Sequence, residues 1–228
     1  MLINNIEVQV NKKDIKHYHL SVMPPNGNVI ISCPKNSDDK VLKVFLSDKI
    51  NWIKKQKEVF KSQKRQSKRQ FVTGETFYIW GVPYKLKFIP NEKQNKIYVK
   101  NDILCLEMKK NSTVKSRFDI VKKYYAEILT KKLEKYVKKW EKTLELESAG
   151  YSVRYMKTRW GSCKDGKLIF NTQLAEKNIK ALDYVVLHEL LHLKHKKHNK
   201  NFVRDMDFYL PNWRLIRDGL NEEILDYI

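Results

Sequence analysis

One segment near the C-terminal end of the chain restricts its fold more than any other, because it has a helical pattern that is apolar on most sides. It runs from Asp183 to Phe202 and carries His188, Glu189 and His192. The apolar residues around these three are Val185, Val186, Leu187, Leu190, Leu191 and Leu193. A helix that is hydrophobic nearly all round is buried. Since buried polar and charged groups are costly unless they are paired, these three side chains need a partner inside the fold.

The spacing of the three residues indicates that this partner is a metal ion. His188 and His192 are four residues apart, so on a helix both imidazoles lie on one face, about 6 Å apart along the axis, and can reach one zinc ion. Glu189 then stands beside the metal without being a ligand, where a general base for a zinc-activated water is needed. The alternative is a chance match on a surface helix, which the apolar surroundings disfavour. The sequence therefore predicts a catalytic Zn²⁺ site with Glu189 as its base.

A catalytic zinc site needs a third protein ligand, and two histidines compete for this position. His195 follows His188 by seven residues, which on an unbroken helix separates their backbones by about 10 Å, too far for easy convergence on one ion. His198 reaches the metal only if the helix ends near Lys196 and the chain folds back. The polar string from Lys196 to Lys200 and the following Phe202 permit such an end, although no glycine or proline enforces it, and we favour His198.

Further groups around the metal are expected from the strand and turn before this helix. Arg159 is the first candidate to stabilise the developing oxyanion and Tyr155 a second one. An ion pair between Arg159 and an acid of the long helix predicted upstream is an equally weighted alternative. Cys163 could block the open metal position as a thiolate, or could simply be a small buried hydrophobic residue.

The pattern of apolar residues predicts an α+β fold with two lobes. Short β-branched runs bounded by Asn, Gly and Pro, with one amphipathic helix after Pro34, indicate a β-rich N-terminal lobe over residues 1–110. From Ser112 to Leu146, apolar residues recur at three- and four-residue spacing, which predicts a long helix. The second lobe, residues 111–228, contains this helix and the metal-binding one. No internal repeat is visible in the sequence.

Composition adds the compartment and one alternative partner. The chain has three scattered cysteines, and its N-terminus lacks the apolar stretch of a signal peptide. We therefore expect a cytoplasmic protein that does not span a membrane. The net charge of +20 would attract polyanions such as nucleic acids, although an equally weighted alternative is ordinary surface solvation. The basic stretches that would bind phosphate are Lys54 to Arg69 and Lys194 to Lys200.

Several strings in the last third of the chain resemble those of a known family. They are RWGSC from Arg159, GKLIFN from Gly166, DYVVLHELLHLKHKKHNKNF from Asp183, and PNW from Pro211. Together they resemble the YgjP-like metallopeptidases, which are similar to the SprT-like and WLM zinc peptidases. The resemblance implies a zincin-like, more closely gluzincin-like, catalytic lobe. It also implies His188, His192 and His198 as zinc ligands and Glu189 as the catalytic acid/base.

Two functions follow from these observations. The first is a zinc-dependent metallohydrolase that cleaves a protein or peptide, whose substrate strand pairs with KLIFN at the edge of a sheet. The second is a basic module that binds nucleic acid non-specifically and in which zinc is mainly structural. Structural zinc sites are usually closed by four ligands and rich in cysteine, so a histidine set with a neighbouring glutamate favours catalysis. The oligomeric state stays open.

Overall fold

The computed structural model describes residues 1–23, 27–62 and 69–222. The chain divides into two compact units, Met1–Arg65 and Gln66–Ile228, and each is described by itself. The fold is of the mixed α+β class, as the sequence predicted. Among the helices of the described residues, none has both the length and the apolar character needed to cross a bilayer.

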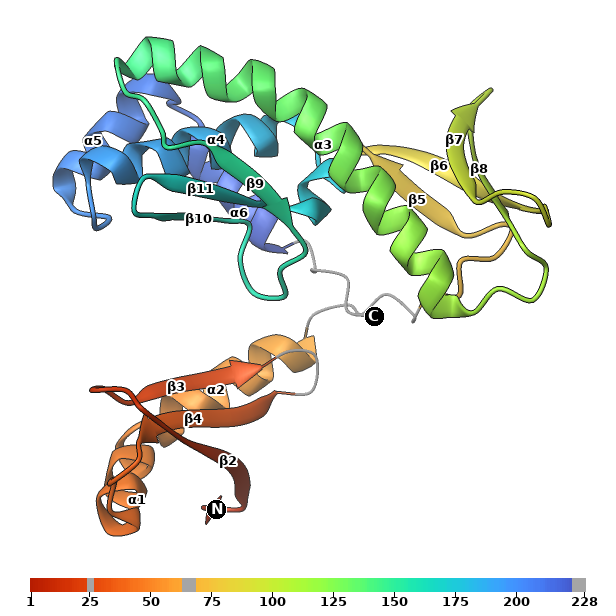
Figure 1. The fold of residues 1–228 in the computed structure, drawn as a ribbon. Helices are drawn as coiled ribbons and strands as arrows, with labels where there is room; N and C mark the ends of the chain where they lie inside the picture. The colour runs from red at the N-terminus through yellow and green to blue at the C-terminus, as the bar shows by residue number, and fades with distance from the viewer. Residues whose placement is uncertain (24–26, 63–68, 223–228) are drawn as a thin grey trace. The chain divides into compact units, whose positions relative to one another are not determined.

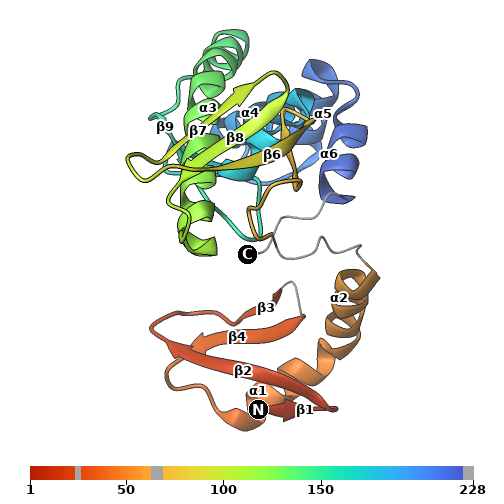
Figure 2. The same cartoon turned by 90° about the vertical axis from the view of Figure 1, so that its right-hand side faces the viewer.

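The first unit is a four-stranded sheet packed against two short helices (Figures 1 and 2). The strands are β1 (Leu2–Ile3), β2 (Ile6–Lys13), β3 (His19–Met23) and β4 (Asn28–Pro34), in the order β1-β2-β4-β3 with β2 and β4 parallel. The helices are α1 (Asp39–Asp48) and α2 (Ile50–Ser62). Alternate residues of β2 and β4 are buried and form a core of their own with Leu42, Leu46 and Ile53.

One continuous helix was expected after Pro34, and the structure has two. The side chain of Asp38 caps the start of α1 by accepting from the backbone N–H of Lys40 at 2.7 Å. The helix ends at Asp48, and Lys49 follows with φ −93° and ψ 1°. This break between α1 and α2 allows Leu46 and Ile53 to enter the same core.

The second unit begins with a sheet of the same strand order. Its strands are β5 (Thr76–Ile79), β6 (Val82–Pro90), β7 (Lys96–Lys100) and β8 (Ile103–Met108), ordered β5-β6-β8-β7 with β6 and β8 parallel. The 31-residue helix α3 (Val114–Leu144) follows and runs past this sheet toward the rest of the unit (Figure 1). Tyr125 of α3 donates its hydroxyl hydrogen to the carbonyl oxygen of Tyr78 at 2.9 Å, which ties the helix to β5.

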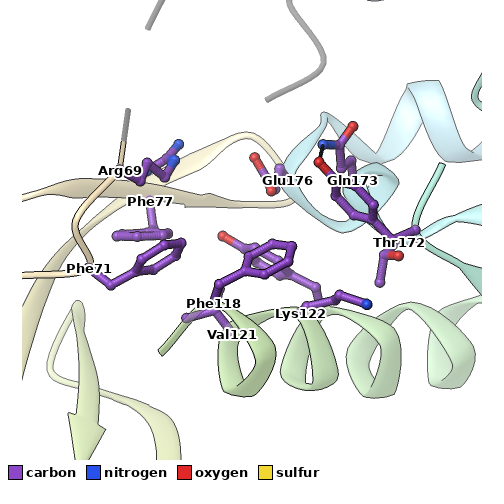
Figure 3. Close-up of a pocket in the computed structure, with 11 residues that line it drawn as sticks. Arg69, Phe71, Phe77, Phe118, Val121, Lys122, Thr172, Gln173 and Glu176 are labelled. Carbon is purple, nitrogen blue, oxygen red and sulfur yellow. Dashed lines mark hydrogen bonds between the residues drawn. The ribbon is translucent and has the colours of Figure 1, made fainter. Parts of the chain in front are cut away.

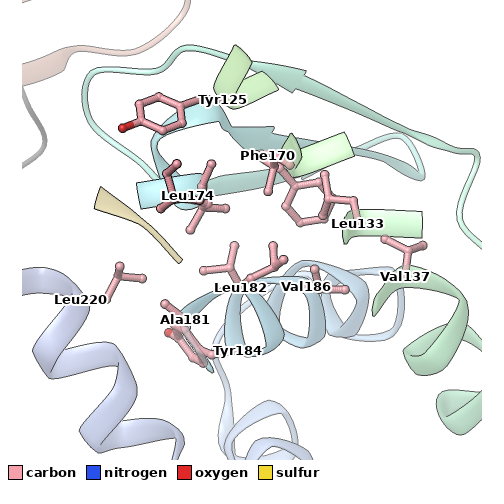
Figure 4. Close-up of a cluster of buried hydrophobic side chains, with 14 of the residues drawn as sticks. Tyr125, Leu133, Val137, Phe170, Leu174, Ala181, Leu182, Tyr184, Val186 and Leu220 are labelled. Atoms are coloured by element: carbon pink, nitrogen blue, oxygen red, sulfur yellow. The ribbon is translucent and has the colours of Figure 1, made fainter. Parts of the chain in front are cut away.

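The rest of the second unit carries a smaller sheet and three helices. Strands β9 (Tyr151–Arg154), β10 (Gly161–Lys164) and β11 (Lys167–Asn171) form a sheet ordered β10-β11-β9. They are followed by the 3-10 turn η1 (Thr172–Glu176), then α4 (Ile179–Lys194), α5 (Lys200–Tyr209) and α6 (Trp213–Glu222). In Figure 4, side chains of α3, β11 and α4 face one another, among them Leu133, Phe170 and Val186. One hydrophobic core therefore joins α3, this sheet and α4.

The division between units lies elsewhere than the boundary expected near residue 110. The β5–β8 sheet belongs with the second unit because its buried residues share the core of α3 and α4. Its first hairpin also docks onto η1, where the N–H groups of Trp80 and Gly81 donate to the carbonyl oxygens of Ala175 and Glu176 at 2.8 and 3.1 Å. These contacts join residues about 100 positions apart, which local sequence patterns do not reveal.

Candidate metal centre

Helix α4 positions the His-Glu-x-x-His residues, and its two ends have clear physical causes. The side chain of Asn178 caps its start by accepting from the N–H of Lys180 at 3.0 Å. The helix ends at Lys194, two residues before the end expected, and His195 is extended with φ −125° and ψ 104°. The side chain of Asn199 then caps α5 by accepting from the N–H of Phe202 at 3.0 Å. The chain therefore turns back over the five residues between α4 and α5.

This reversal brings three imidazoles together. The Nε2 atom of His198 lies 3.0 Å from that of His188 and 3.1 Å from that of His192. A tetrahedral zinc ion with bonds of about 2.0–2.1 Å holds its ligand nitrogens about 3.3 Å apart. Within the described residues, these three histidines form the one group of potential metal ligands whose atoms lie within 4.8 Å of one another. Their donor set and spacing fit a zinc ion.

The protonation of the rings also suits a metal. Burial, reinforced by the neighbouring His192 and His198, lowers the pKa of His188 to about 3, so this ring is neutral at physiological pH. Burial likewise lowers the pKa of His198. A neutral imidazole keeps the lone pair that a metal requires.

The ring of Phe202 forms the floor beneath the three histidines. It is 1% exposed, and its centroid lies 5.0 Å from that of His188, 5.1 Å from that of His192 and 4.8 Å from that of His198. A rigid apolar surface of this kind limits the rotation of each ring. The sequence interpretation missed Phe202, although its place one turn into the helix after His198 was a usable signal.

Glu189 is buried, at 6% exposed, on the same helix. Burial raises the pKa of its carboxyl group to about 7, and the nearby positive charge of Arg159 opposes this shift. A cation held by the three histidines would lower the value. A carboxyl group that titrates near neutrality can both accept and return a proton, as a general base must.

Gly161, at the start of β10, makes room for this carboxyl group. A Cβ atom placed there would lie 2.6 Å from Oε1 of Glu189 and 2.7 Å from its Cγ. Only glycine lets the strand approach the acid so closely. Sequence reasoning did not single out Gly161, and its position between Trp160 and Ser162 gave no spacing signal.

Arg159 is exposed and lies on the loop between β9 and β10. Its positive charge acts to lower the pKa of Glu189, and no ion pair joins it to α3 in the part of the chain that the structure describes. The buried side chain of Asn171 holds this loop, donating from Nδ2 to the carbonyl oxygens of Met156 and Arg159 at 2.8 and 2.9 Å. Asn171 is a third residue, after Phe202 and Gly161, that the sequence interpretation missed.

Tyr155, the second oxyanion candidate, points elsewhere. It lines a pocket between α3, β5 and η1 (Figure 3). Its ring packs edge-on against Phe118 with centroids 5.6 Å apart, and its hydroxyl oxygen accepts from Nε2 of Gln173 at 3.2 Å. The other residues that line the pocket include Arg69, Phe71, Phe77 and Lys122. These contacts hold the side chain of Tyr155 in this pocket, and its hydroxyl group bonds to Gln173 rather than to the metal centre.

Cys163 lies on β10 with its side chain partly buried against the core. Burial raises the pKa of its thiol, with a smaller contribution from the charge of Glu189. Its sulfur is not among the atoms that converge with the three histidines. This placement fits the small buried hydrophobic residue better than the blocking thiolate.

The segment KLIFN was expected at a sheet edge, and this expectation was wrong. It forms β11, which lies between β10 and β9. The outer strand nearest Glu189 is β10, since Gly161 touches the acid. The turn at Asp165-Gly166 pairs β11 with β10 on one side, and β9 pairs with its other side. Strand β11 is therefore central in the sheet.

The two basic stretches proposed for nucleic acid are only partly described. Residues 63–68 of the first stretch lie outside the described residues. In the second stretch, Lys194 forms an ion pair with Asp205 at 3.0 Å, and Lys196 and Lys197 are exposed. The nucleic-acid alternative stays a prediction.

The fold and the three convergent histidines beside a buried glutamate place the protein among metal-dependent peptidases of the His-Glu-x-x-His type. Comparison with family models gives the particular group: the model described as "YgjP-like, metallopeptidase domain" matches residues 17–223. The chain belongs to the YgjP-like family, and the resemblance seen in the sequence is confirmed.

Other comparisons add little. The crystal structure of the metallopeptidase zymogen of Methanocaldococcus jannaschii jannalysin is 23% identical, with a TM-score of 0.36, and the match covers 40% of this chain and 94% of that chain. A likeness this slight supports no conclusion. No curated protein matches the sequence.

Proposed function

We propose that this metallopeptidase is a zinc enzyme that hydrolyses protein or peptide substrates, with His188, His192 and His198 as ligands. The observation that carries the proposal is the convergence of three Nε2 atoms at the spacing of a tetrahedral site. When bound, zinc supplies a Lewis acid that polarises the scissile carbonyl and makes water more acidic. The free thiols of Cys33, Cys105 and Cys163 are compatible with the cytoplasmic location that forms part of the proposal.

Glu189 is the proposed general base. One of its carboxylate oxygens accepts a proton from the attacking water, and the same group returns a proton to the amine that leaves. Burial suits it for both steps, since it raises the pKa of the carboxyl group toward neutrality. The absence of a side chain at Gly161 leaves room for this acid beside β10.

The substrate strand is proposed to pair with β10, the outer strand next to Glu189. Backbone pairing at a sheet edge binds an extended peptide with little dependence on its sequence. Arg159, at the entrance to β10, is proposed to stabilise the negative charge that develops on the carbonyl oxygen. Its exposed position leaves it accessible to a bound substrate.

Glu189→Gln tests the proposal, because it removes the proton acceptor and no ligand. We expect hydrolysis of a denatured protein substrate to fall by at least about 10²-fold, with about one zinc per chain retained by elemental analysis. Glu134→Gln is the matched control, since Glu134 is exposed on α3 and forms a surface ion pair with Lys138. Loss of zinc in Glu189→Gln would show that Glu189 is a ligand, and an active variant would remove it from the mechanism.

A further inference from the structure

His195 lies beside the metal centre without joining it. Its Nε2 atom is 2.8 Å from Oδ2 of Asp205 on α5, and it does not belong to the group of converging ligand atoms. A carboxylate accepts only, so the ring of His195 donates this hydrogen bond. Both side chains are nearly buried, at 10% and 11% exposed, where a charge-assisted hydrogen bond is strong.

The backbone of His195 contacts a proposed ligand directly. Its carbonyl oxygen lies 2.9 Å from Nδ1 of His192. A carbonyl oxygen cannot donate, so Nδ1 of His192 carries the hydrogen. A neutral imidazole has one N–H group, and Nε2 of His192 is thereby left with a free lone pair toward His188 and His198.

This contact depends on the break in the chain at His195. In a continuing helix its carbonyl group would point along the axis, but with ψ 104° it points elsewhere and meets His192. The same residue still closes α4, because its N–H donates to the carbonyl oxygen of Leu191 at 2.8 Å. The bond to Asp205 holds His195 in this extended conformation.

Helix α5 carries on one face the two residues that contact the ring of His192 and the ring of His195. Phe202 and Asp205 are three residues apart, which places them side by side on a helix. Phe202 lies under His192, with ring centroids 5.1 Å apart and planes at 26°. Asp205 bonds to the ring of His195, and Phe202 and Asp205 are both buried.

We propose that His195 and Asp205 are positioning residues for the metal site, which set the tautomer and orientation of His192 through the backbone carbonyl of His195. The inference rests on the proposed metal site. It excludes His195 as a ligand, and it assigns Asp205 a role that needs no contact with metal or substrate.

The first test measures zinc affinity by competition with a chromophoric chelator. His195→Ala and Asp205→Ala should each weaken zinc binding by about 10–100-fold, and the double variant should be no weaker than either single one, since the two residues act as a unit. His195→Gln should restore most of the affinity, because its amide can donate to Asp205 and its backbone is unchanged. A zinc ligand could not be replaced in this way, so failure of the Gln variant to rescue would overturn the proposal.

Lys194→Gln is the matched control. Lys194 bonds to the same carboxylate oxygen at 3.0 Å but is 52% exposed, and its loss should change zinc affinity by less than about twofold. If Lys194→Gln weakens zinc binding as much as His195→Ala does, the bond between His195 and Asp205 has no special role, and the proposal is wrong. If an alanine variant fails to fold, as judged by circular dichroism, Asp205→Asn replaces it.

The second test needs no metal. Imidazole ¹⁵N spectra of the metal-free protein should show the hydrogen of His192 on Nδ1, and His195→Ala should shift the population toward Nε2–H. A wild-type protein with the hydrogen on Nε2 would overturn the inference. If instead the tautomer is as expected and the protein binds no zinc, the proposed function fails and the positioning of His192 stands.

Discussion

The two four-stranded sheets of this chain have the same topology, β1-β2-β4-β3 and β5-β6-β8-β7, each with an antiparallel hairpin on either side of a parallel central pair. The turn of the first hairpin also has two left-handed residues in both sheets, Asn4-Asn5 between β1 and β2 and Trp80-Gly81 between β5 and β6. The likeness is invisible as a sequence repeat. Pairing and turn geometry can therefore be shared while side chains differ.

The sheets differ in the elements that cover them. The first closes its core with the short helices α1 and α2. The buried residues of the second sheet belong to a core that also contains residues of α3, β11 and α4, the helix of His188 and Glu189. The helices that follow each sheet in the chain, more than the topology of the sheet, thus decided which sheet shares a core with the helix of His188 and Glu189.

The largest loss of zinc and activity is expected when two of the three proposed ligands in the second unit are removed. His188→Ala combined with His192→Ala should abolish zinc binding and hydrolysis, because two of three ligands are lost. His17→Ala combined with His19→Ala is the control, since both residues are exposed in the first unit. Elemental analysis after dialysis measures the zinc content of both variants. A full zinc content in His188→Ala/His192→Ala would contradict the assignment of the site.

Core substitutions test whether the units are independent. Leu46→Ala and Leu106→Ala each remove a side chain that is 0% exposed and should each cost about 2–5 kcal/mol of unfolding free energy. Only Leu106→Ala should lower the denaturant concentration at which zinc is released, because Leu106 shares the core of α4. If Leu46→Ala and Leu106→Ala affected zinc release equally, the two units would not be independent.

Gly161→Ala addresses the three-stranded sheet, for which the first unit has no counterpart among the described residues. The added methyl group would displace Glu189 and should lower kcat by about 10²-fold, as misplacement of a catalytic group does, with zinc retained. Gly219→Ala is the matched control, since nothing lies within 4 Å of its added Cβ. A fully active Gly161→Ala enzyme would show that Glu189 has room to move.

The smallest effect concerns two turns of left-handed residues, one in each sheet, between β1 and β2 and between β7 and β8. Asn5→Gly and Asp102→Gly replace exposed residues with φ of 62° and 60°. Each relieves left-handed strain but frees the unfolded chain, so a gain of about 0.5 kcal/mol or less is expected at both positions. Thermal unfolding of the two variants should shift in the same direction, and opposite signs would show that left-handed strain does not decide the stability of both turns.

The sequence by itself determined the elements whose signals are local. The apolar surroundings and four-residue spacing of His188 and His192 defined a buried helix, and the apolar periodicity of residues 112–146 defined α3. The α+β class and the family also followed from local strings. These signals lie within a few helical turns or one strand, where the backbone period alone orders side chains.

Only the tertiary structure decided which residues meet across long stretches of chain. It placed β11 inside its sheet, joined the β5–β8 sheet to the core of α4 and set Gly161 against Glu189. It also placed the rings of His195 and His198 apart, where the sequence had only favoured His198 as the third ligand. The ring of His195 is drawn to Asp205 and that of His198 toward His188, because the end of α4 and the capped start of α5 fix the direction of the chain between them. Such contacts depend on pairing and packing partners far along the chain, and no local period encodes them.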